Sequence, residues 1–234
     1  ERYRLYMNDG NGTFTEDTVE RGAAVTSPGD PNYGTSVAFG DYNTDGYVDV
    51  VMGEWSGNND GKQPNARLLK NRGPEAPGHF EDVTLAANAS LGSYNPETAT
   101  GGFIRAFTPR FADLDNDGHP DLTVAAEGGR SKLLWNDGDG TFTDGTAAAG
   151  INTGRTDMGS TIGDFNGDGK LDWFITDVSN GNPAPDGNRL FRNDGNRSFT
   201  DVTDARGVPD GGWGWGTSFF DHNNDGDLDL VMTN

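Results

Sequence analysis

Asp113-Leu-Asp115-Asn-Asp117-Gly118-His119-Pro-Asp121 is one of four copies of a short acidic pattern, Asp-x-(Asp/Asn)-x-Asp-Gly-x-x-Asp. The other copies begin at Asp41, Asp164 and Asp221. Side-chain oxygens stand at alternate positions of the pattern, and the glycine stands where the chain must turn sharply. A calcium ion takes about six to eight oxygen ligands in a flexible arrangement, so each copy is predicted to be a calcium-binding loop.

Each predicted site takes side-chain oxygens from positions 1, 3, 5 and 9 of the pattern and a backbone carbonyl from position 7. The sequence therefore predicts about four bound calcium ions. Magnesium is disfavoured because it takes fewer protein ligands in a stricter octahedral geometry. The predicted ligands are Asp41, Asn43, Asp45, Tyr47, Asp49, Asp113, Asp115, Asp117, His119, Asp121, Asp164, Asn166, Asp168, Lys170, Asp172, Asp221, Asn223, Asp225, Asp227 and Asp229.

Two other interpretations fit the acidic copies less well. An EF-hand loop needs a glutamate at position 12 and helices on both sides, whereas position 12 is apolar here, as at Met52 and Val124. The residues that follow the copies alternate as a strand does. Solvated turns without metal would crowd carboxylates together in every copy, at a cost in like-charge repulsion.

A second motif alternates with the acidic one and has the form of a β-hairpin. Two short apolar runs flank an Asn/Asp/Gly cluster at residues 5–16, 69–84, 134–144 and 191–203. Each repeat then contains strand, calcium loop, strand, connection, strand, tight turn and strand. Antiparallel units of four strands, repeated every 50 to 70 residues or so, predict an all-β fold of the β-propeller type.

The chain is predicted to be a single propeller over residues 1–234. Its blade units are expected at about 33–84, 104–144 and 157–203, with a composite fourth blade in which 214–234 is completed by 2–17. The half-units at the two termini would also be expected if the chain were a segment of a larger propeller. They also fit pairing between subunits, which leads to filaments when the rotation does not close. Glycine-rich crossings such as 211–216 and 150–154 are expected to allow close approach near the propeller axis.

Composition narrows the class of partner. The chain has 234 residues, 32% hydrophobic residues, 36 glycines and no cysteine, and no stretch long and apolar enough for a membrane-spanning helix. A net charge of −20 argues against nucleic acid. Loops with affinities typical of extracellular modules fill only outside the cytosol, so an extracellular, secreted or cell-surface location is expected. A start at Glu1 without methionine or signal peptide is expected of a processed product.

These repeats resemble the FG-GAP/VCBS repeats of integrin α-type β-propellers, and most closely those of the cartilage acidic protein and ASPIC/UnbV group. The resemblance rests on residues 188–195, on Phe199-Thr-Asp-Val-Thr203 and on the stretch from Gly216 to Leu230. It implies calcium at the positions given above, an extracellular setting, and a role in adhesion or recognition. Such propellers usually have seven blades, whereas four repeat units stand in this sequence.

A binding module is favoured over an enzyme. Two of the three histidines lie inside acidic copies, and no nucleophile motif is present. The first version is a rigid scaffold for adhesion, protein recognition or self-assembly, with loops 53–66, 86–104 and 178–188 as its contact face. The alternative is a calcium-dependent lectin in which Trp55, Trp213 or Trp215 stacks on sugars. An enzyme acting on polysaccharides has the least support. Sequons at Asn11, Asn88 and Asn196 are candidate glycosylation sites.

Overall fold

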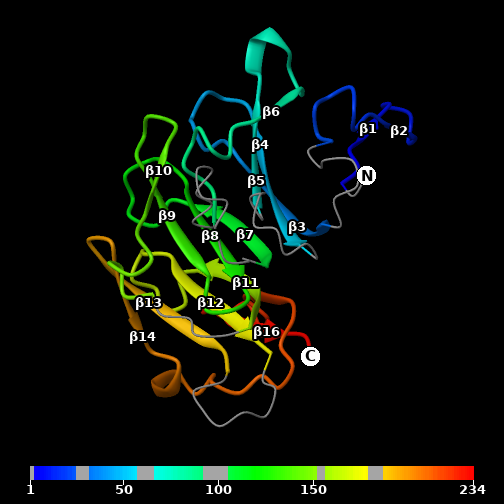
Figure 1. Ribbon diagram of the computed structural model, residues 1–234. Helices are drawn as coiled ribbons and strands as arrows, with labels where there is room; N and C mark the ends of the chain where they lie inside the picture. The colour runs from blue at the N-terminus through cyan, green and yellow to red at the C-terminus, as the bar shows by residue number, and fades with distance from the viewer. Residues whose placement is uncertain (1–2, 25–31, 57–65, 92–104, 152–155, 179–186) are drawn as a thin grey trace.

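The computed structural model describes residues 3–24, 32–56, 66–91, 105–151, 156–178 and 187–234, and within them the fold is all-β (Figure 1). Three antiparallel sheets of four strands follow one another along the chain. Blade I consists of β3 (Asn32–Gly40), β4 (Asp49–Ser56), β5 (Ala66–Asn71) and β6 (Phe80–Asp82). Blade II consists of β7 (Ala106–Ala112), β8 (Asp121–Ala126), β9 (Lys132–Asn136) and β10 (Phe142–Asp144). Blade III consists of β11 (Asp157–Gly163), β12 (Asp172–Asp177), β13 (Arg189–Gly195) and β14 (Ser198–Asp201).

Two hairpins flank the blades. They are β1 (Tyr6–Asn8) with β2 (Phe14–Glu16), and β15 (Thr217–Phe220) with β16 (Asp229–Met232). The helices of the described residues are 3-10 turns of three residues each, Gly73–Glu75 and Asp204–Arg206, and neither is long enough to cross a membrane. The predicted blade-type architecture is confirmed, with the strands in chain order across each sheet.

The two-residue period of the strands explains how the blades pack. Along β8, Leu122 and Val124 are fully buried in a cluster shared with blade I, whereas Ala125 is buried in a cluster shared with blade III. Successive side chains of a strand point to opposite faces, so one apolar strand serves two interfaces. Trp173 and Phe191 of blade III complete the second cluster, with ring centroids 6.2 Å apart. The core therefore lies between blades rather than within one sheet.

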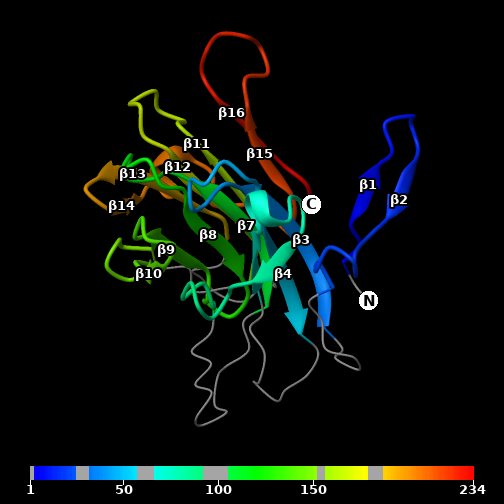
Figure 2. The same ribbon diagram turned by 90° about the horizontal axis from the view of Figure 1, so that it is seen from above.

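The first strand of each blade lies innermost, and β3, β7, β11 and β15 neighbour one another in chain order (Figure 2). Glycine allows this approach, as predicted for the 211–216 crossing. A β-carbon on Gly159 of β11 would lie 1.9 Å from the carbonyl oxygen of Trp215, and one on Gly214 would lie 2.9 Å from the β-carbon of Thr176. Neither position has room for a side chain.

The two terminal hairpins contact different blades, and among the described residues the strands of each pair only with one another. The segment around β1–β2 lies beside blade I, where the Tyr3 hydroxyl donates to the Gly53 carbonyl and the Phe80 N–H donates to the Arg21 carbonyl at 2.8 Å. The β15–β16 hairpin instead contacts β11. Because each packs against a different blade, the composite blade of 214–234 with 2–17 is not formed among the described residues of this chain.

Candidate metal centres

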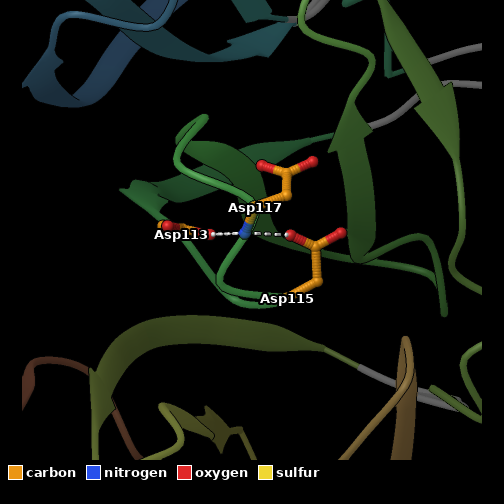
Figure 3. Close-up of side chains that lie close together, drawn as sticks. All are labelled: Asp113, Asp115 and Asp117. Atoms are coloured by element: carbon orange, nitrogen blue, oxygen red, sulfur yellow. Dashed lines mark hydrogen bonds between the residues drawn. The ribbon is translucent and has the colours of Figure 1, made fainter.

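The four acidic loops lie between the first and second strands of successive sheets and share one hydrogen-bonding frame. We call them acidic loops 1 (41–49), 2 (113–121), 3 (164–172) and 4 (221–229). In acidic loop 2, Asp113 accepts the N–H of Asp117 at 3.1 Å (Figure 3). It also accepts the N–H of Gly118 at 3.0 Å. The aspartates at position 1 of the other loops accept the equivalent pair of N–H groups. The carboxylates are therefore held inward by the backbone.

Glycine at position 6 is needed for its backbone angle rather than for space. Gly118 has a φ of +91°, and nothing lies within 4 Å of the place where its β-carbon would be. At this φ a side chain would clash with its own backbone. The sharp turn aims the Asp117 carboxylate back along the loop, where one oxygen accepts the N–H of His119 at 2.9 Å.

Acidic loop 2 brings together enough oxygen ligands for a cation. One carboxylate oxygen from each of Asp113, Asp115 and Asp117 lies within 4.8 Å of the others. Such a cluster of hard anionic oxygens suits calcium. The other loops have asparagine at position 3, and its amide oxygen holds the same place in the frame: Asn166 Oδ1 accepts the N–H of Asp168 at 2.9 Å. The residues of acidic loop 2 could therefore hold a metal ion.

The aspartate at position 9 anchors each loop to the sheet. Asp121 is fully buried, and its two oxygens accept the N–H groups of Leu114 and Asn136, each at 2.9 Å. Asp49 and Asp172 are buried in the same way. Asp229 is exposed, because among the described residues β15–β16 has no third strand to cover acidic loop 4. Within the same residues it accepts one N–H, that of His222. Each carboxylate oxygen has a second lone pair, so anchoring leaves position 9 able to bind a cation.

Sequence reasoning missed the asparagines that tie acidic loops 1 and 2 to the next blade. Asn136 donates from its amide to the Pro120 carbonyl of its own loop at 2.9 Å and to the Tyr42 carbonyl of acidic loop 1 at 2.7 Å. Asn193 of blade III does the same to Leu171 and to Leu114 of acidic loop 2. The sequence signal for these contacts is the asparagine that ends each Leu-x-Asn or Phe-x-Asn run, a residue that is also common in turns.

Burial sets the charge state of the anchoring aspartates. It raises the pKa of Asp121 to about 7 and those of Asp49 and Asp172 to about 6. Main-chain hydrogen bonds oppose the rise, and the other carboxylates of each loop add to it. A nearby cation would favour the ionised form, so these buried carboxylates fit a metal site.

The raised pKa values predict a pH dependence of the calcium-free protein. The folded state keeps a proton on these aspartates at pH values where the unfolded chain has lost it, so it binds more protons between the ordinary pKa of 3.8 and about 7. Stability is therefore expected to fall as pH rises through this window. Melting curves in EDTA from about pH 5 to about pH 8 test this. Saturating calcium should reverse the loss, and equal losses with and without calcium would contradict the explanation.

The remaining predicted residues lie away from the loops' carboxylates or on the surface. Trp213 and Trp215 are 50% and 46% exposed, and the ring of Trp215 meets that of Phe107 edge-on at 6.3 Å between centroids. Trp55 lies under the Arg105 guanidinium, 5.3 Å from the ring centroid. The sequon residues Asn11, Asn88 and Asn196 are all exposed.

Comparison with known families identifies the repeat. The FG-GAP-like repeat matches residues 1–52, 113–175 and 174–232, which is most of the chain. The chain belongs to the FG-GAP-like repeat family. The FG-GAP-like match thus includes acidic loops 1, 2, 3 and 4.

Two curated relatives of this FG-GAP-like chain confirm the resemblance to cartilage acidic protein. Mouse cartilage acidic protein 1 is 27% identical over 205 residues, which cover 84% of this chain and 27% of the relative. The human protein of the same name is 27% identical over 204 residues, covering 83% and 26%. The chain therefore spans about a quarter of the length of these relatives.

Two solved structures are similar to this chain at a lower sequence identity than these relatives. One is an Agrocybe aegerita lectin described as recognising non-reducing terminal N-acetylglucosamine, with a TM-score of 0.46 and 18% identity over 99% of this chain and 51% of the lectin. The other is the V. cholerae biofilm matrix protein Bap1, with a TM-score of 0.45 and 19% identity over 89% and 30%.

Proposed function

We propose that this chain is a calcium-stabilised extracellular propeller that acts as a scaffold for recognition or adhesion, without a catalytic role. The observation that carries the proposal is the repeated frame of the acidic loops, in which backbone N–H groups hold several carboxylates facing one another. Holding like charges together costs free energy unless a cation neutralises them. About four calcium ions, one in each acidic loop, would do so.

Membership of the FG-GAP-like family supports both the proposed calcium ions and the proposed extracellular location. FG-GAP-like repeats often bind calcium, and both curated relatives carry the name of a cartilage protein, which fits an extracellular location. The net charge of −20 also fits, because divalent ions at the loops would reduce the self-repulsion of the folded chain. Calcium loops of modest affinity fill outside cells, where calcium is abundant.

The partner is an extracellular protein or a glycan. The protein-binding version places its contacts on the long connections between strands, whose central residues 57–65, 92–104 and 179–186 lie outside the described residues. The glycan-binding version rests on Trp213 and Trp215, because half-exposed aromatic rings can stack on sugars. Glycans on Asn11, Asn88 or Asn196 would belong to the same extracellular setting.

Self-association is a further part of the proposal. Phe39 of β3 is 62% exposed and lines a pocket with Tyr3 and Leu5, which precede β1. Val231 of β16, in the other terminal hairpin, is 47% exposed. Two hairpins from different copies could form one four-stranded blade and bury such side chains, since an unpaired strand edge is a template for pairing. Sedimentation at increasing protein concentration would measure this self-association.

A combined array of glycans and extracellular-matrix proteins, probed in millimolar calcium and in EDTA, tests the function. We expect binding to at least one class of partner in calcium and its loss in EDTA. Several hits that share one sugar, and that disappear in Trp213→Ala or Trp215→Ala, would select the lectin. Hits on proteins that survive both substitutions would select the protein scaffold. Binding that is unaffected by EDTA would reject calcium as a structural requirement.

A further inference from the structure

Arg197 stands at a sequence position where two other copies of the hairpin motif have glycine. The hairpin motif reads Asn-Asp-Gly-Asn-Gly-Thr-Phe at 8–14 and Asn-Asp-Gly-Asp-Gly-Thr-Phe at 136–142, but Asn-Asp-Gly-Asn-Arg-Ser-Phe at 193–199. The glycines at the equivalent position of the other two copies, Gly12 and Gly140, both have a φ of +91°. Arg197 has a φ of +60°, and Asn196 before it has a φ of +52°. An arginine in this left-handed region is uncommon, and such outliers cluster where the side chain has a task.

The side chain of Arg197 reaches from blade III into acidic loop 2 of blade II. Its Nε donates to Asp115 Oδ2 at 2.5 Å, and one of its terminal nitrogens lies 3.4 Å from Asp117 Oδ2. The guanidinium also lies over the ring of Trp135, 5.1 Å from the centroid. The side chain of Asp115 is only 8% exposed, so this ion pair is largely shielded from water on the acidic side.

The loop that receives this arginine is also the loop with an acid at position 3. Position 3 is Asp115 in acidic loop 2, whereas it is Asn43, Asn166 and Asn223 in the others. The negative charge at position 3 and the arginine therefore occur at the same place. Lys170 of acidic loop 3 also pairs with a ligand aspartate, Asp168, at 3.0 Å, but it belongs to the same loop and does not join two blades.

We propose that Arg197 is a counter-cation of acidic loop 2 that lowers the loop's calcium affinity and makes its occupancy sensitive to the contact between blades II and III. The inference rests on the calcium binding proposed above. In calcium-free protein the guanidinium offsets the repulsion among Asp113, Asp115 and Asp117. When calcium binds, the ion must enter beside a fixed positive charge, which weakens binding. Acidic loop 2 is then the adjustable site of the four.

The Arg197→Gly variant tests the proposal without endangering the fold, because glycine is what two other copies of the hairpin motif carry at this position. Calcium titration by calorimetry should show about threefold to tenfold tighter binding at acidic loop 2, as expected for removing one positive charge near a divalent ion in a partly screened setting. The Asp117→Ala variant, which removes a ligand of this loop, identifies its step in the titration. The gain in Tm on adding calcium should also be larger in Arg197→Gly than in the unaltered chain.

A control variant separates the effect of the Arg197 contact on calcium affinity from the effect of the overall charge. Arg192→Gln removes a positive charge from the same hairpin, but within the part of the chain that the structure describes Arg192 pairs with Asp194 and forms no ion pair with an acidic loop. It should leave the affinity of acidic loop 2 unchanged. In an Asp115→Asn background, which makes acidic loop 2 like the others, the effect of Arg197→Gly should shrink.

Equal affinities in Arg197→Gly and Arg192→Gln, or weaker binding in Arg197→Gly, would overturn the inference while leaving calcium binding intact. If no variant binds calcium, it is the proposed function that fails instead. The two failures are therefore distinguishable in one set of titrations.

Discussion

Removal of calcium with EDTA is expected to lower the Tm by about 10–20 °C relative to the protein in millimolar calcium. A ligand at about ten times its Kd stabilises the folded state by roughly 1.4 kcal/mol per site, so four filled loops contribute about 5–6 kcal/mol. A domain of this size changes its Tm by roughly 2–4 °C per kcal/mol. Differential scanning calorimetry at a fixed pH measures the shift.

The specificity of this effect can be checked with magnesium. Magnesium added after selective chelation of calcium should restore little of the lost stability, because it demands an octahedral geometry and retains its water. Asp45→Ala, Asp117→Ala, Asp168→Ala and Asp225→Ala should each remove a part of the calcium-dependent shift. Identical melting curves in EDTA and in millimolar calcium would show that the loops hold their shape without the ion.

The acidic loops and the blades could be predicted because their signals are local. Gly118 and the alternating aspartates of acidic loop 2 follow from turn geometry and ligand chemistry within nine residues. The alternation of Leu122 and Val124 in β8 follows from the strand period, and both are buried as such a strand requires. The acidic loop and the strands of one repeat can therefore be predicted from the residues of that repeat alone.

The contacts between repeats could not be predicted from local patterns. Asn136 reaches the Tyr42 carbonyl across 94 residues of sequence, and Arg197 reaches Asp115 across 82. Which loop faces which blade depends on the angle between sheets, and this angle is set by side-chain packing over many residues. The position of the two terminal hairpins depends on the same angles between sheets. No local pattern therefore predicts whether the two hairpins pair with each other or pack against different blades.

These contacts between repeats connect the acidic loops to the propeller core. Acidic loop 1 accepts a hydrogen bond from Asn136 of blade II, and acidic loop 2 accepts one from Asn193 of blade III. A loop that loses its shape would therefore disturb its own sheet and the interface with the next one. Calcium bound at a loop would stabilise both, because fixing the loop fixes the acceptor that the neighbouring asparagine requires.

Asp121→Ala is expected to be the most damaging single substitution, with a loss of about 3–5 kcal/mol of folding free energy even in EDTA. It leaves two buried N–H groups, those of Leu114 and Asn136, without an acceptor. Each orphaned donor costs about 1–3 kcal/mol, and the removed side chain leaves a void as well. Urea unfolding in EDTA isolates this anchoring role from calcium binding.

Asp229→Ala is the matched control, because Asp229 holds the same place in acidic loop 4 but is exposed and accepts a single main-chain N–H, that of His222. Water can replace that acceptor, so the loss in EDTA should stay below about 1 kcal/mol. In calcium, both variants should lose the contribution of one site. Equal losses in EDTA would mean that position 9 acts only as a calcium ligand, since burial and hydrogen bonding would then make no difference. A large loss confined to Asp121→Ala would show that the third strand of a complete blade turns a metal ligand into a structural anchor.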